Sequence, residues 1–350
     1  MSSNEQVLVD ETVVGKDDRI PLRVLILASD VLFPHFFSET QLSLLSEVAS
    51  WSRSSEREDS ETLRTALAKA DVLMTTWHSP FLRMEMFGPQ PRVRLIAHCG
   101  GEVKSRVEEK VFDTITVTNA AEPMAAPVAE MAIAMVLSLV RRLSDYTSEM
   151  TRGVTRTNEY VSHGETLAGR TVGVIGFGRI GKAFARLIQP FGVQLLITDP
   201  SCNADQADAY GATLLGLDEL LSKSSVVVLA AGLTEQSRNL LDRRRLGLMP
   251  DGGFLVNVAR GGLVDMEALL TELRKRRLSV ALDVTDPIEP LPPAHELRHL
   301  PNVLLTPHIA AGGIEMRRAI GCVAVAEVVR FCKGEELQNV VTQEMLLTMT

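Results

Sequence analysis

A glycine-rich turn between a predicted strand and a predicted helix is the first sign of chemistry. The apolar run Thr171–Ile175 leads directly into GFGRIG, residues 176–181, and a helical pattern follows. Gly176 can make the tight turn, Gly178 lets the backbone approach a pyrophosphate, and Gly181 lets helix and strand pack closely. The pyrophosphate would lie against the free N–H groups at the helix start, where the dipole is positive. The turn therefore predicts a dinucleotide site.

A carboxylate ends the next predicted strand. Asp199 follows the run VQLLIT, eighteen residues after Gly181. It can accept hydrogen bonds from both hydroxyls of an adenosine ribose, and it would repel a 2′-phosphate. The neighbouring Pro200 and Ser201 supply no positive charge to offset that repulsion. NAD is therefore expected rather than NADP. The alternative hypothesis is that the glycines only form a tight turn and that Asp199 only caps the end of its strand.

Three later strand ends carry polar or ionisable side chains. Arg260 follows the run Phe254–Val258, and His308 follows Asn302–Thr306. Between them, Leu278–Leu282 leads into DVTDPIEPLPPAHEL, which is rich in carboxylates and prolines. Ligands in open α/β sheets bind at the carboxyl ends of the strands, so all three ends could face one cleft.

Together with a nicotinamide, these groups could carry out one reaction, the reduction of a 2-oxo acid. Reducing a 2-oxo acid needs a cation for the carboxylate, a proton donor for the carbonyl oxygen and a hydride donor. Arginine can grip a carboxylate bidentately, and histidine titrates near neutral pH. A carboxylate behind the imidazole would orient it. Taken singly, Arg260 could be a surface ion-pair partner, Glu289 a loop carboxylate and His308 a satisfied core histidine.

The elements that must position these groups form two α/β segments. Buried runs alternating with helical patterns predict parallel sheets covered on both faces. The expected fold is two doubly wound parallel-sheet domains: a Rossmann NAD-binding domain (122–310) and a smaller, flavodoxin-like substrate domain (20–121 with 311–350). Residues 1–19 are expected to be a flexible segment. The first segment shows strand patterns at Leu22–Ala28, Asp71–Thr75, Val93–Ala97 and Ile115–Val117, and helical patterns at Glu58–Lys69 and Lys104–Phe112. The second adds strands at Gln194–Thr198 and Ser225–Ala230, with helices at Pro127–Leu143 and Ile314–Phe331.

Composition excludes several classes of partner. The net charge of −8 argues against nucleic acid and anionic membranes, which need a basic surface. The basic runs Arg243–Arg245 and Arg274–Arg277 read as solvated helix faces. Four scattered cysteines favour reduced thiols in a cytoplasmic protein and no metal site. The longest apolar run, Met131–Val140, is too short to span a membrane.

The chain resembles the D-isomer-specific 2-hydroxyacid dehydrogenases, which include phosphoglycerate, glycerate and formate dehydrogenases. The resemblance runs from about Arg23 to the end. The matching stretches are VAEMAIAMVLSLVRR, LAGRTVGVIGFGRIG, VNVARGGLVD, ALDV…EPLP and LPNVLLTPHIA.

The resemblance implies a role for each matched residue. Arg260 would bind the substrate carboxylate, and His308 would donate the proton with Glu289 paired to it. Asp283 and the backbone of Val258–Arg260 would border the nicotinamide. The loop AHCGGEVKSR would hold the substrate through backbone N–H groups at Gly100 and Gly101. The predicted cofactor-binding residues are Gly176, Gly178, Arg179, Ile180, Gly181, Asp199, Val258 and Asp283.

Three departures from the family pattern stand out. The stretch LAAGLTEQS, with Ala230 and Gly232, lacks the family's His-Ala-Pro type sequence. The GGEVK loop departs from the commoner glycine-valine-glycine pattern, so no substrate subgroup is implied. Asp283 and Glu289 are six residues apart rather than the usual five, which makes Ile288 the expected bulge. The spacing of nineteen from Glu289 to His308 still fits.

The leading hypothesis is an NAD-dependent enzyme that interconverts a 2-oxo acid and a D-2-hydroxy acid, with two domains closing over the substrate. An NAD(H)-sensing, corepressor-like binding protein on the same fold is the alternative, by fold analogy. A transhydrogenase-like or alanine-dehydrogenase-like enzyme is disfavoured by the order of Arg260, Glu289 and His308. The substrate side chain stays open, with Trp77, His78 and Lys104 as pocket candidates. The apolar helix Val128–Val140 suggests a homodimer.

Overall fold

The computed structural model describes residues 21–153, 164–347 and 349, so the predicted flexible segment 1–19 lies outside the described residues. The chain divides into two compact units. Unit 1 contains the residues up to Met124 and from Gly313 onward, and unit 2 spans Ala125–Gly312. The predicted boundaries after 121 and 310 lie within three residues of these divisions. The roles predicted for the two domains stay predictions.

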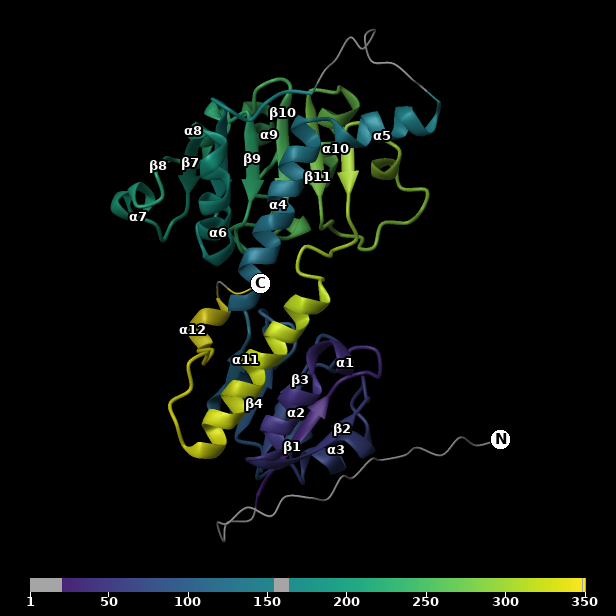
Figure 1. The fold of residues 1–350 in the computed structure, drawn as a ribbon, viewed down its shortest axis with the longest axis vertical. Helices are drawn as coiled ribbons and strands as arrows, with labels where there is room; N and C mark the ends of the chain where they lie inside the picture. Colours follow the sequence, from purple (N-terminus) through teal and green to yellow (C-terminus); the bar gives the residue numbers. More distant parts are fainter. Residues whose placement is uncertain (1–20, 154–163, 348, 350) are drawn as a thin grey trace. The chain divides into compact units, whose positions relative to one another are not determined.

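Unit 1 is built on a five-stranded parallel sheet in the order β2-β1-β3-β4-β5 (Figure 1). Helix α3 and the adjoining 3-10 turns pack on one face, and α11 lies against the other with α1 and α2. The strands are β1 (Leu22–Leu27), β2 (Ala49–Ser54), β3 (Val72–Thr75), β4 (Leu95–His98) and β5 (Thr116–Asn119). The helices are α1 (Phe33–Phe36), α2 (Glu39–Ser46), α3 (Glu61–Leu67), η1 (Met84–Phe87), η2 (Glu109–Asp113), η3 (Glu122–Met124), α11 (Ile314–Lys333) and α12 (Gln343–Leu346).

Two features of unit 1 differ from the sequence prediction. Strand β2 was not predicted, because its sequence ASWSRS is mostly polar and most of its side chains are at least partly exposed at the sheet edge. The helix expected over Lys104–Phe112 is wrong except for the short η2 at its end. There the chain forms a bridge between Leu82 and Val107, so the backbone satisfies its hydrogen bonds across the loop instead of along a helix.

Unit 2 contains a seven-stranded parallel sheet in the order β12-β11-β10-β9-β6-β7-β8. The six predicted strands are present, and β8, with the sequence ATL, was not predicted. The strands are β6 (Thr171–Ile175), β7 (Gln194–Thr198), β8 (Ala212–Leu214), β9 (Val226–Leu229), β10 (Gly253–Asn257), β11 (Leu278–Leu282) and β12 (Val303–Leu305). The chain builds outward from β6 in one direction and then from β9 in the other, so the topological switch point lies between β6 and β9.

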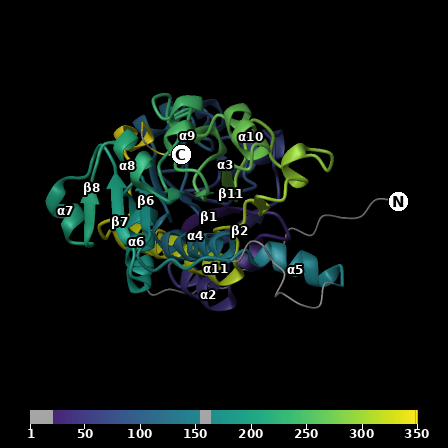
Figure 2. The same ribbon diagram turned by 90° about the horizontal axis from the view of Figure 1, so that it is seen from above.

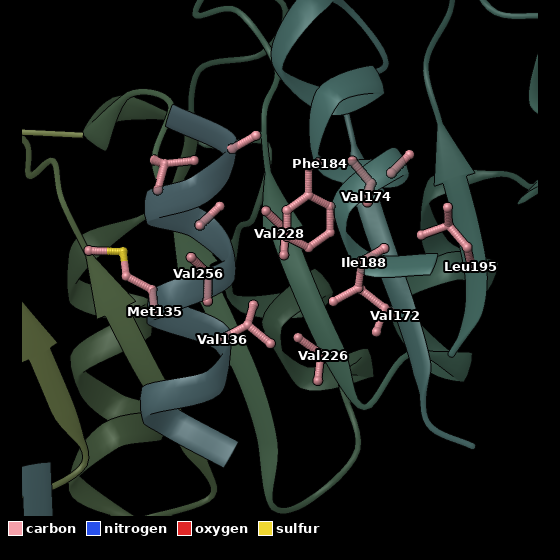
Figure 3. Close-up of a cluster of buried hydrophobic side chains, with 14 of the residues drawn as sticks. Met135, Val136, Val172, Val174, Phe184, Ile188, Leu195, Val226, Val228 and Val256 are labelled. Carbon is pink, nitrogen blue, oxygen red and sulfur yellow. The ribbon is translucent and has the colours of Figure 1, made fainter. Parts of the chain in front are cut away.

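Helices cover both faces of the unit 2 sheet (Figure 2). Helices α4 and α6 pack on one face, where Figure 3 shows Met135 and Val136 beside Val256 and Phe184 over the sheet valines. Helices α8, α9 and α10 pack on the other face. The helices are α4 (Ala125–Val140), α5 (Leu143–Thr151), α6 (Arg179–Ile188), η4 (Gln189–Phe191), α7 (Ala204–Asp208), α8 (Leu217–Lys223), α9 (Arg243–Leu248), η5 (Gly261–Leu263), α10 (Met266–Arg274) and η6 (Glu296–Arg298).

The helical segment Glu122–Val140 is longer than the apolar run suggested. Its 19 residues are long and apolar enough to cross a membrane by length and composition, a test that the core helices of globular proteins also pass. In unit 2, Ala132, Val136 and Val140 are fully buried in the core against the sheet. These residues form the face of α4 that packs against the sheet of unit 2.

Several residues of the two basic runs form ion pairs. Arg244 and Arg245 both contact Asp218, and Arg274 contacts Glu296. Arg277 pairs with Glu272 and donates to backbone carbonyls.

Candidate active site

The glycine turn after β6 has the shape that a dinucleotide requires. Gly176 has φ +95°, and a Cβ there would lie 2.5 Å from the backbone of Ala231. A Cβ on Gly181 would lie 2.2 Å from the carbonyl oxygen of Gly176, so only glycine lets α6 start this close to β6. Gly178 is exposed, and nothing lies within 4 Å of its Cβ position. The turn therefore leaves open space beside its exposed glycine, where a phosphate group can approach the backbone.

Helix α6 begins at this turn without a side-chain cap. Its N-cap is Gly178, which has no side chain to accept from the first N–H groups. Arg179 is exposed, whereas Ile180 is partly buried against the core of unit 2. The uncapped N–H groups of a ten-residue helix provide the donors and the positive dipole end that a pyrophosphate would use.

Asp199 follows β7 and contacts the glycine turn directly. Its Oδ2 accepts a 2.7 Å hydrogen bond from the N–H of Phe177, and its Oδ1 accepts from the N–H of Ser201 at 2.7 Å. These two bonds fix the carboxylate beside the turn. The position suits a group that recognises the ribose next to a pyrophosphate.

Arg260 stands on a turn that is fixed by a buried asparagine. Asn257, 1% exposed at the end of β10, donates from Nδ2 to the carbonyl of Arg260 and accepts from the N–H of Ala259. Val258 within this turn is buried in the core. A Cβ on Gly261 would lie 2.2 Å from the carbonyl carbon of Thr285. Glycine therefore lets the Arg260 turn pack against the loop after β11.

Asp283 anchors the segment that presents His308. This carboxylate is 2% exposed and accepts from Thr306 Oγ1 at 2.5 Å and from the N–H groups of Ile309 and Ala310 at 2.9 Å. The His308 N–H also donates to the Asp283 carbonyl. Both side-chain oxygens already have donors, so the geometry favours a positioning role. The predicted contact with nicotinamide stays a prediction.

His308 and Glu289 are in contact, as their spacing predicts. Nδ1 of His308 is hydrogen-bonded to Oε1 of Glu289. The second carboxylate oxygen, Oε2, accepts from the N–H of Thr285 at 3.1 Å. The imidazole is 51% exposed and the carboxylate 34%, so Nε2 can meet a substrate from solvent.

The inserted residue is accommodated by an outward bend. The Ile288 side chain is 47% exposed, and its carbonyl accepts from Thr285 Oγ1 at 2.7 Å. The peptide bonds before Pro287 and Pro290 are both cis. The other carboxylates of this loop serve the surface: Asp286 contacts Arg238 at 3.5 Å and Glu296 pairs with Arg274. Glu289 is therefore the loop carboxylate that contacts His308.

In unit 1, the predicted substrate loop follows β4. The N–H of Gly100 bonds to the carbonyl of His98, and the carbonyl of Gly101 accepts from Asn119 Nδ2. Within the described residues, the N–H groups of Gly101 and Glu102 donate to no protein acceptor. A Cβ on Gly100 would lie 2.5 Å from Nε2 of His98, which explains glycine at this position. The N–H groups of Gly101 and Glu102 are therefore unpaired donors within this loop.

The three further pocket candidates of unit 1 differ in their contacts and in their exposure to solvent. Trp77 packs edge-on against Phe36 at 5.2 Å, and His78 is exposed with Nδ1 3.4 Å from Ser29 Oγ. Lys104 is exposed in the loop after β4. The anchors Asn257 and Thr306 were not singled out from the sequence. Both lie at strand ends within the stretches that match the family, and this position is the feature of the sequence that could have identified them.

Comparison with known proteins identifies the family. Residues 133–310, about half of the chain, match the family described as D-isomer specific 2-hydroxyacid dehydrogenase, NAD binding domain. A glyoxylate reductase from Thermococcus onnurineus is 33% identical over 294 residues, covering 82% of this chain and 87% of that protein. A D-3-phosphoglycerate dehydrogenase from Methanocaldococcus jannaschii is 29% identical, over 80% of this chain and 53% of its own length.

The fold agrees with solved structures. A glyoxylate reductase from Paecilomyes thermophila superimposes with a TM-score of 0.79 at 22% identity, over 93% of this chain and all of that one. The chain therefore belongs to the D-isomer specific 2-hydroxyacid dehydrogenase family. It is an NAD-dependent dehydrogenase of D-2-hydroxy acids, and NAD is its cofactor.

Proposed function

We propose that the protein interconverts a 2-oxo acid and its D-2-hydroxy acid with His308 as the general acid and base. The observation that carries this proposal is the contact between His308 and Glu289 at the end of β12. The Arg260 turn belongs to β10, and β11 lies between these two strands in the sheet. Thus a proton donor and a cation follow strands of the same sheet edge.

Each side chain has one task in this mechanism. Arg260 binds the substrate carboxylate through its guanidinium, a geometry suited to two parallel hydrogen bonds. Nε2 of His308 donates a proton to the carbonyl oxygen during reduction and takes it back during oxidation. Glu289 accepts from Nδ1 and so fixes the ring orientation. NADH, when bound, supplies the hydride.

The cofactor would be held by the groups around the glycine turn. The uncapped start of α6 would take the pyrophosphate, and Asp199 would accept from the ribose hydroxyls. The fit rests on three features: the open space at Gly178, the lack of a side-chain cap and the Asp199 carboxylate fixed beside Phe177. Val258 lines the turn that would border the nicotinamide.

The relatives suggest which substrates to try first. The named glyoxylate reductases and D-3-phosphoglycerate dehydrogenases favour small or phosphorylated 2-oxo acids and their D-2-hydroxy products. The direct test is a screen of 2-oxo acids that follows loss of NADH absorbance, with chiral analysis of the product. Turnover to the D-isomer is expected. Tight NADH binding without turnover of any acid would instead support the sensing protein.

We further propose a cytoplasmic homodimer. Met131, Ile133 and Leu137 of α4 stay partly exposed, and Leu143 and Met150 on α5 are 51% and 59% exposed. Apolar residues on consecutive helices are what a symmetric interface would bury. Sedimentation analysis of the wild type and of Leu143→Glu tests this, since the charged variant is expected to shift the population toward monomer.

A further inference from the structure

The loop after β11 carries Glu289 on a stretch with little support of its own. Val284 at its start is 2% exposed and Leu291 at its end is 9% exposed, whereas residues 287–290 are all exposed. Within the described part of the chain, no backbone–backbone hydrogen bond involves residues 285–290. The ends of the loop are therefore buried, and the position of the carboxylate between them depends on contacts that involve side chains.

Thr285 makes two of these contacts with the far side of the loop. Its N–H donates to Oε2 of Glu289 at 3.1 Å, and its Oγ1 donates to the carbonyl oxygen of Ile288 at 2.7 Å. The first bond holds the carboxylate itself, and the second holds the residue immediately before it. One threonine therefore restrains both the side chain and the backbone at the Glu289 position.

The hydroxyl bond of Thr285 closes the bend that contains the inserted residue. A longer connection has more conformations to restrict, and burial restricts this one little, because the Ile288 side chain is 47% exposed. The ion pair of Asp286 with Arg238 joins two exposed side chains at 3.5 Å, which is a weak constraint. The bond from Thr285 Oγ1 is therefore the main restraint on the bend that leads into Glu289.

The backbone of Thr285 is itself fixed by packing on the Arg260 turn. Gly261 lies against the carbonyl group of Thr285 so closely that no Cβ would fit between them. On its other side, the same turn is held by the buried Asn257, which donates to the carbonyl of Arg260. Thr285 can therefore restrain Glu289 from a rigid base, as a supporting residue must.

Resting on the function proposed above, we propose that Thr285 is a positioning residue for the reaction. Its hydroxyl and N–H hold Glu289 where the carboxylate orients the imidazole of His308. One carboxylate oxygen bonds to Nδ1 of His308 and the other accepts from Thr285, so Glu289 links the two residues. Thr285 acts through Glu289 alone, and the role requires its hydroxyl rather than the shape of its side chain.

The test separates the hydroxyl from the shape of the side chain. Thr285→Val keeps the branched shape and removes the donor, whereas Thr285→Ser keeps the donor. With the 2-oxo acid that the wild type reduces fastest, Thr285→Val is expected to lower kcat about tenfold, and Thr285→Ser to stay within about twofold of wild type. The change in KM should be smaller than the change in kcat, because Arg260 binds the substrate carboxylate. Thr285→Ala is the second variant that lacks the hydroxyl.

Thr271→Val is the matched control. It also removes a hydroxyl that donates to a backbone carbonyl in unit 2, at 3.0 Å to Glu267 within α10, and it should leave kcat unchanged. In a Glu289→Ala background, Thr285→Val should add less than about a twofold loss, because no carboxylate is left to position. An unchanged kcat in Thr285→Val, no rescue by serine, or a full tenfold loss in the Glu289→Ala background would overturn the proposal.

Nitrogen NMR of the His308 ring separates this proposal from the proposed function. In alkaline buffer without substrate, the bond to Glu289 should favour the tautomer with hydrogen on Nδ1, and the spectrum of His308→Gln identifies the signals. Thr285→Val is expected to shift the population toward the Nε2–H tautomer. If the wild type reduces 2-oxo acids and neither kcat nor the tautomer changes in Thr285→Val, the positioning role fails while the reaction stands. If the tautomer shifts but the wild type reduces no acid, the positioning of the ring stands and the proposed function fails.

Discussion

The sheet edges of the two units differ in what fixes their charged groups. At the carboxyl edge of unit 2, the protein supplies the partners itself: backbone N–H groups hold Asp199 and Asp283, and Glu289 bonds to His308 and Thr285. In unit 1, Arg317 at the start of α11 lies over the ring of Trp77 and donates to His35, and it has no carboxylate partner among the described residues. Groups that take part in a proton transfer must be oriented in advance, and the carboxylates of unit 2 have the partners that do this.

The largest expected effect comes from removing the proton donor. His308→Gln should lower kcat by about 10²–10⁴ on every 2-oxo acid, because glutamine can hydrogen-bond but cannot transfer the proton. Steady-state kinetics measures the loss, and NADH fluorescence titration checks that cofactor affinity is kept. A variant that keeps most of its activity would contradict the proposed role of His308 as the proton donor.

A smaller effect is expected from the carboxylate beside the glycine turn. Asp199→Ala should weaken the preference for NADH over NADPH by about tenfold or more, since the repulsion of a 2′-phosphate is lost. The ratio of kcat/KM for the two cofactors reports it. Asp205→Ala, which changes a carboxylate in the first turn of α7, is the control. An unchanged ratio would leave Asp199 as a structural cap of the turn.

Buried His98 in unit 1 should affect stability rather than turnover. Burial lowers its pKa from 6.5 to about 3, and Thr75 Oγ1 is 2.8 Å from its Nδ1. Between those pH values the unfolded chain binds a proton that the folded chain does not, so stability falls as the pH is lowered. The contribution is up to about 1.4 kcal/mol per pH unit.

Urea unfolding across that pH range measures this dependence. His98→Asn is expected to reduce the slope of stability against pH, whereas His299→Asn, at an exposed position, should not. An unaltered slope in His98→Asn would show that His98 is protonated in the folded protein.

The sequence allowed much of unit 2 to be predicted, because its strands are continuous apolar runs and its polar groups stand immediately after them. It also placed Glu289 against His308 despite the inserted residue. Less of unit 1 was predictable. Edge strand β2 is mostly polar, and the 104–112 segment satisfies its backbone across a bridge instead of forming a helix. The contacts of Arg317 with Trp77 and His35 could not be foreseen, since these residues lie far apart in the sequence.

The central claim is that Glu289 acts on the reaction through His308. Measuring kcat for Glu289→Gln, His308→Gln and the double variant tests it directly. Glu289→Gln should be slower than wild type, and the double variant should match His308→Gln within about twofold, because an orienting group has nothing left to orient. If the two losses multiply in the double variant, Glu289 acts independently of His308 and the account is contradicted.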